Sequence, residues 1–188
     1  MQAVQLIDDL VERTKDNLNR AQLLKTQPES TLNYKPKAEC WSALECLEHL
    51  NRYSDFYVPE MRQRMKASTA TAADTFTSGW LGDKLAKSLL PQSQGGAQKM
   101  NSPKKMNPKG SQLDKSVVDT FIRYQYGLLD LLKEARQKNL STIKTGITLT
   151  QLIKLRLGDT FRVVIYHTQR HLGQAERAVK QYQMAQPS

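Results

Sequence analysis

Three histidines are the residues of this chain whose types and spacing point to chemistry. His167 and His171 form an H-x-x-x-H pair, which places both imidazoles on one face of an α-helix. His49 is the remaining histidine and lies in a separate amphipathic stretch. Two ligands from one helix and a third from a neighbouring helix would leave a metal ion with an open coordination position. The three residues are therefore candidate ligands of a divalent metal ion, and three histidines suit zinc, nickel, iron or manganese alike.

The same spacing is compatible with other interpretations. Buried histidines are also satisfied by neighbouring carbonyl or hydroxyl groups without any metal. The H-E-x-x-H pattern of metalloproteases needs a glutamate directly after the first histidine, and Thr168 stands there instead. The sequence has no glycine-rich phosphate loop, nucleophile elbow or C-x-x-C pair, so no catalytic residue is assigned. The residues expected to orient or assist the histidines are Glu45, Cys46, Tyr53 and Gln174.

Four long segments carry the 3.6-residue apolar period of amphipathic helices, and no stretch alternates like a half-buried strand. They cover about residues 2–25, 42–66, 114–138 and 159–182. Ser42 and Glu45 form an S-x-x-E capping box at the start of the second segment, where Pro59 is expected to kink or break the helix. Asp159 is the expected N-cap of the fourth segment. The sequence thus predicts an all-α four-helix bundle.

A long connection separates the second and third helical segments. Between residues 67 and 110 the periodicity fades and Ser, Thr, Ala, Gly and Pro dominate, with a short helix expected near residues 81–90. So long a connection in a small domain is typical of a functional or flexible loop. Its most basic stretch, residues 99–109, indicates a surface loop.

Length and composition limit the function classes. A chain of 188 residues fits one domain, here residues 1–188, and has no apolar run of the ~20 residues that a membrane span needs. The net charge is +10, but the basic residues are spread along every segment without a nucleic-acid-binding motif, so a nucleic-acid partner is not expected. The N-terminus carries Asp8, Asp9 and Glu12 and does not resemble a signal peptide. We therefore expect a cytoplasmic protein in which Cys40 and Cys46 remain thiols, Cys46 most simply as a small buried residue.

The sequence resembles the DinB-like superfamily, also described as DinB/YfiT-like metalloenzymes. One part of the match is Trp41-Ser42 with Glu45, Leu47, Glu48-His49-Leu50 and Tyr53. The other is Leu157-Gly158-Asp159 leading into His167-x-x-x-His171, with Gln174 one turn further on. The stretch Lys99–Lys105 with Pro108 resembles a loop of one subgroup.

This resemblance implies an up-down-down-up bundle, a metal bound by His49, His167 and His171, and frequent homodimers. Some relatives are thiol transferases, so it also implies a low-molecular-weight thiol and a small electrophile as substrates. The expected function is that of a metal-dependent enzyme, either a thiol S-transferase or a hydrolase. The alternative is a non-catalytic metal-binding or stress-related helical interaction protein.

Overall fold

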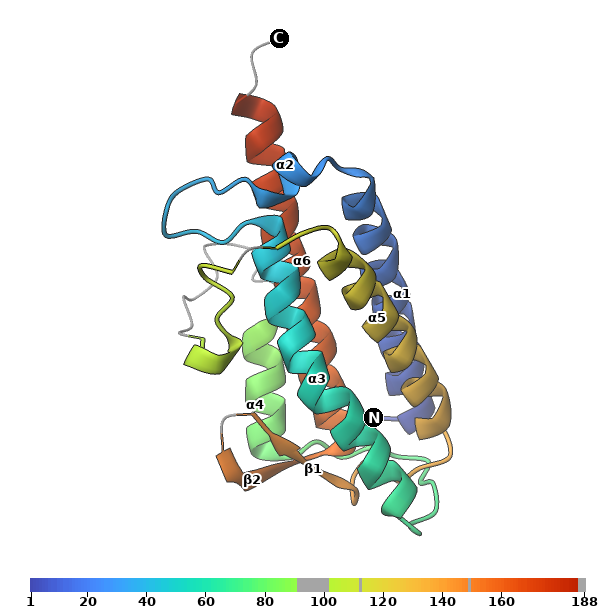
Figure 1. Cartoon of the computed structure of the whole chain (residues 1–188). Helices are drawn as coiled ribbons and strands as arrows, with labels where there is room; N and C mark the ends of the chain where they lie inside the picture. Colours follow the sequence, from blue (N-terminus) through green and yellow to red (C-terminus); the bar gives the residue numbers. More distant parts are fainter. Residues whose placement is uncertain (91–101, 112, 149, 186–188) are drawn as a thin grey trace.

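Four long helices lie side by side and form the body of the molecule (Figure 1). The computed structural model describes residues 1–90, 102–111, 113–148 and 150–185. The long helices are α1 (Ala3–Thr26), α3 (Ala43–Ala67), α5 (Ser116–Ala135) and α6 (Leu157–Ala185). Helix α1 packs against α5 and α6, and α3 packs against the same two helices, so the four close a bundle. In Figure 1, α1 and α6 run upward and α3 and α5 downward, which confirms the predicted up-down-down-up bundle.

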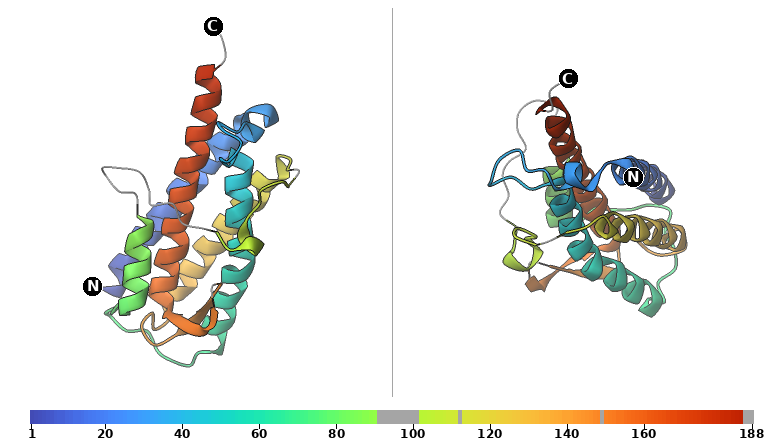
Figure 2. Two further views of the ribbon diagram at one scale, coloured as in Figure 1. Left: turned by 90° about the vertical axis from the view of Figure 1, so that its left-hand side faces the viewer. Right: turned by 45° about the horizontal axis from the view of Figure 1, so that its top comes forward.

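Helices α3 and α5 are consecutive among the long helices and run in the same direction. The chain between them must therefore cross from one end of the bundle to the other. This crossover contains α4 (Trp80–Leu89), which packs along α6 as Figure 2 shows, and a 3-10 helix at Lys104–Met106. The short helix expected near residues 81–90 is therefore confirmed. Within the basic stretch, residues 99–101 lie outside the described residues, and the remainder is ordered against α3. A short helix α2 (Glu29–Asn33) follows α1.

The capping box at the start of α3 is present. The Ser42 hydroxyl accepts a hydrogen bond from the Glu45 amide at 3.2 Å, and the Glu45 carboxylate accepts one from the Ser42 amide at 2.9 Å. These bonds satisfy amides that lack a partner within the first helical turn. Pro59 was expected to kink or break the helix; the break was wrong, because α3 continues through this residue to Ala67.

A β-hairpin that the sequence pattern did not predict precedes α6. Strands β1 (Lys144–Ile147) and β2 (Thr150–Arg156) pair in antiparallel fashion, and β2 leads directly into α6. Its pattern was missed because apolar residues do not all face the core: Leu152 is 94% exposed, whereas Leu155 is buried. The residues directly before the last helix thus form a strand.

The prediction that Asp159 caps the last helix was also wrong. Helix α6 begins at Leu157, and Asp159 lies fully buried within its first turn. Its carboxylate accepts hydrogen bonds from the Ser78 hydroxyl, from the Gly79 amide at 2.8 Å and from Arg162 at 3.2 Å. Asp159 therefore fastens the segment before α4 to α6 instead of capping its own helix.

The apolar core is divided into two clusters by a layer of buried polar residues. One cluster includes Leu10, Leu128 and Ile165, and the other includes Ala21, Phe121 and Leu172. The polar residues that fall between these clusters along the four helices are Thr14, Asn17, Asn51, Ser54, Gln125 and Thr168. The three histidines of α3 and α6 lie at this same level of the bundle. In the described part of the chain, no helix is long and apolar enough to cross a membrane.

Candidate metal centre

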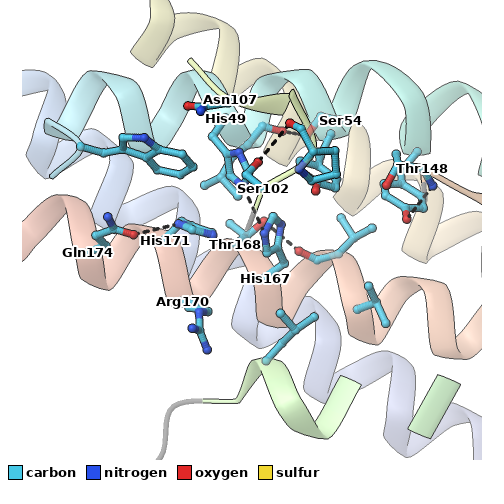
Figure 3. A pocket seen from close by; sticks show the side chains of 18 of the residues that line it. His49, Ser54, Ser102, Asn107, Thr148, His167, Thr168, Arg170, His171 and Gln174 are labelled. Atoms are coloured by element: carbon cyan, nitrogen blue, oxygen red, sulfur yellow. Dashed lines mark hydrogen bonds between the residues drawn. The ribbon is translucent and has the colours of Figure 1, made fainter. Parts of the chain in front are cut away.

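The three histidines converge between α3 and α6 (Figure 3). One ring nitrogen of each histidine can serve as a ligand atom, and these three nitrogens all lie within 4.8 Å of one another. The Nε2 atoms of His49 and His167 are 3.3 Å apart. Two imidazole nitrogens bound to one tetrahedral ion at about 2.1 Å lie about 3.4 Å apart, so this pair already has the required separation. The geometry is compatible with a single metal ion held by all three residues.

Hydrogen bonds hold two of the rings in one orientation. His49 Nδ1 lies 2.7 Å from the Met106 carbonyl oxygen, and His171 Nδ1 lies 3.0 Å from Gln174 Oε1. Both partners are acceptors, so each Nδ1 carries the proton and donates. The Nε2 atom of each ring then carries a free lone pair, which is the tautomer that a metal ligand requires.

Burial keeps all three imidazoles neutral. Desolvation lowers the pKa of His49 to about 4, assisted by nearby Arg52 and opposed by the bond to Met106. Desolvation, then the proximity of His49, lowers the pKa of His171 to about 3. The pKa of His167 is also well below its usual value, first through desolvation and then through the other two rings. Metal binding at neutral pH would therefore displace no proton from a charged imidazolium.

The loop around the 3-10 helix contributes to the site through Arg52. Its guanidinium donates to the Asn107 carbonyl at 2.8 Å and to the Ser111 hydroxyl at 3.3 Å, while Glu48 accepts from its Nε at 2.8 Å. Arg52 lies one turn after His49 on α3, so it places the Met106 carbonyl against the imidazole. The sequence analysis did not find this contact. The i, i+3 spacing of His49 and Arg52 was visible, but the loop that both residues bind was not.

The four residues expected to assist the histidines fall into two groups. Gln174 bonds to His171, and the Tyr53 ring lies 4.9 Å from the His49 ring and 4.7 Å from the His167 ring. Glu45 is instead occupied by the capping box and by Lys35, whose ammonium lies 2.7 Å from its carboxylate. Cys46 is fully buried in the apolar core, where desolvation raises the pKa of its thiol. The structure thus brings Gln174 and Tyr53, but not Glu45 and Cys46, to the histidines.

A cavity of about 720 Å³ opens beside the three histidines. Cys40 and Trp41 line it, and the sequence analysis assigned neither of them to the site. The Trp41 ring lies 4.7 Å from that of His49 and 5.7 Å from that of His171. The site therefore has one wall of aromatic rings and an adjoining space large enough for a small organic molecule.

Fold and site together define a class of protein, a helical bundle with three converging histidines beside a cavity. A family model described as the DinB superfamily matches residues 10–175, a range that includes the three histidines and most of the bundle. The chain belongs to this superfamily, as the sequence resemblance indicated. No curated protein and no solved structure shows a significant match to the chain.

Proposed function

We propose that this protein is a metal-dependent enzyme that adds a low-molecular-weight thiol to a small electrophile. The observation that carries the proposal is the convergence of three neutral imidazoles at the wall of a cavity. His49, His167 and His171 would hold one divalent ion of zinc, nickel, iron or manganese. Three protein ligands leave a further coordination position, as in catalytic rather than structural zinc sites. Membership of the DinB superfamily supports the same conclusion.

The donor set fits such an ion. Its three nitrogens are neutral, two are oriented by hydrogen bonds from the opposite side of the ring, and all face the same space. When bound, a divalent ion lowers the pKa of a coordinated thiol or water, so that a nucleophile forms near neutral pH. The protein's own part is to keep the imidazoles deprotonated and aimed at that position.

The neighbouring side chains have separate tasks. Tyr53 has a raised pKa, chiefly through desolvation, so its phenol remains a hydrogen-bond donor at neutral pH. The Trp41 and Tyr53 rings both lie against the His49 ring and reduce its contact with water. Cys46 is buried away from the cavity with a raised pKa, so the thiol nucleophile comes from a cosubstrate rather than from this residue.

The first experiment measures metal. The full chain, purified without chelator, should contain one divalent ion per molecule by elemental analysis, and its melting temperature should rise when zinc or nickel is added. His49→Ala, His167→Ala and His171→Ala should each lose the ion and the thermal response. Gln169→Ala, on α6 between two of the histidines, is the matched control and should retain both. A wild-type protein without stoichiometric metal and without a thermal response would contradict the proposed site.

The second experiment measures the reaction. The metal-loaded protein is assayed with small thiols and an electrophile such as monochlorobimane, and separately with ester and amide substrates. Formation of the thioether with release of chloride, if it is lost in His171→Ala, supports a transferase, while ester or amide cleavage alone would support the hydrolase instead. One bound ion without turnover of either kind would favour a non-catalytic metal-binding protein. Light scattering of the same samples tests the expected homodimer.

A further inference from the structure

The cavity beside the histidines has two chemically different ends. The charged residues that line it are Arg170, Arg177, Lys109 and Glu39. In Figure 3, Gln174 lies on one side of the histidines and Thr148 on the opposite side, while Arg170 is level with His171 along α6. The apolar residues that line the cavity include Leu85 and Leu89 of α4, Ile147 of β1, and Val163 and Val164 near the start of α6.

Helix α6 sets the spacing between these ends. At a rise of about 1.5 Å per residue, Val164 lies about 10 Å before His171 along the helix axis, and Arg177 about 9 Å after it. Helical side chains lean toward the N-terminus, which brings the Arg177 head group back toward His171. Its Nη1 atom lies 3.4 Å from the position that a Cβ atom on Gly173 would occupy. This contact places the guanidinium level with Gly173 along α6, two residues after His171.

The positive charge of Arg177 is not neutralised by a neighbour. Within the described residues, its guanidinium makes no hydrogen bond or ion pair, and it is exposed to solvent. The adjacent Arg20 is different, because both its Nε and Nη2 donate to the Glu176 carboxylate at 2.6 and 2.9 Å. Lys109 is a further positive residue of the cavity lining. This end of the cavity therefore favours a negatively charged group.

We propose that the cavity binds an amphiphilic anion. A carboxylate or a similar anionic group pairs with Arg177 and Lys109, and an apolar portion occupies the space between α4 and α6 at Leu85 and Val164. The middle of such a ligand passes the three histidines. This proposal rests on the proposed function, because it assumes that the reacting atoms lie at the metal. It adds the class of substrate, which is an anionic molecule with an apolar part.

Binding of simple carboxylates tests the charged end. Hexanoate, octanoate and decanoate are titrated calorimetrically into the full chain, with 1-octanol as the neutral probe. Arg177→Ala should weaken octanoate about tenfold, as expected for a charged hydrogen bond at a partly exposed site, and leave 1-octanol unchanged. Arg62→Ala removes the same charge from an exposed arginine outside this cavity and should change neither. Equal losses in the two variants, or equal affinities for octanoate and 1-octanol, would overturn the charged end.

Chain length tests the apolar end. Each added methylene should strengthen binding by up to about fourfold if it is fully buried. Leu85→Gln should reduce this increment, whereas Leu81→Gln, on the same helix but outside the cavity lining, should not. An affinity independent of chain length in the wild-type protein would refute an apolar tail site.

Each titration is run with chelator and again with one equivalent of zinc. If octanoate binds in the presence of chelator and Arg177→Ala weakens that binding, the inference is supported even if zinc does not bind. Zinc binding without any carboxylate binding supports the proposed metal site and overturns the amphiphilic ligand. The two proposals therefore fail in different measurements.

Discussion

Acidification of the metal-free protein should destabilise it, because its buried imidazoles resist protonation. The pKa values of His49 and His171, about 4 and about 3, lie below the usual value of 6.5. At a pH between the folded pKa of each residue and 6.5, the unfolded chain binds a proton at that residue and the folded chain does not. The contribution of each neutral imidazole is complete above about pH 6.5 and is lost as the pH falls toward its folded pKa. At pH 5, each of these two residues should lower the free energy of unfolding by about 2 kcal/mol relative to pH 7.5.

The total loss for these two residues is about 4 kcal/mol, and His167 acts in the same direction. Urea denaturation followed by circular dichroism, at pH 7.5 and pH 5 in the presence of chelator, measures the free energy of unfolding. His171→Gln should reduce the difference between the two pH values by about 2 kcal/mol. Gln169→Ala, which removes no titratable group, should leave that difference unchanged. If His171→Gln and the wild-type protein lose the same free energy on acidification, the imidazole is not held neutral by burial.

Three further predictions concern single residues. Gln174→Leu removes the acceptor of the His171 Nδ1 proton and should weaken zinc binding about tenfold in a competition titration, whereas Gln174→Glu should preserve it. Gly82→Ala places a Cβ atom 2.5 Å from the buried Asp159 carboxylate, so the free energy of unfolding should fall by about 1–3 kcal/mol, and an unchanged value in urea would contradict this packing. Asn17→Leu removes two buried polar atoms that have no hydrogen-bond partner among the described residues. The free energy of unfolding should rise by about 1 kcal/mol, and a fall would indicate that the amide has a partner in solution.

Local signals predicted the helices well. The capping box of Ser42 and Glu45 is formed within four consecutive residues, so it is legible without any tertiary contact. The hairpin before α6 was missed for the opposite reason. The exposure of Leu152 and the burial of Leu155 follow from how β2 packs against the rest of the molecule, and a single apolar stretch does not reveal which side faces the core. Asp159 was misassigned because its partners Ser78 and Gly79 lie about eighty residues away.

The candidate site shows the same division. The spacing of His167 and His171 indicated a shared helix face, and His49 was expected to join them. The spacing also made Cys46 a possible neighbour, since it lies three residues before His49, although a small buried residue was the simpler interpretation. In the folded chain Cys46 belongs to the apolar core and Cys40 lines the cavity instead. A separation of three residues on a helix allows two side chains to point to different neighbours, and packing decides which.

The sequence by itself determined the four helices, their order and the three histidines, because helix formation and the sharing of a helix face depend on residues within one or two turns. The tertiary structure alone decided that His49 Nε2 meets His167 Nε2 across 118 residues of chain. It also decided the tautomer of His49, through the carbonyl of Met106 in the distant loop, and the charged and apolar ends of the cavity. These features depend on how α3, α4, α6 and the crossover pack together, and long-range packing leaves little trace in local residue patterns.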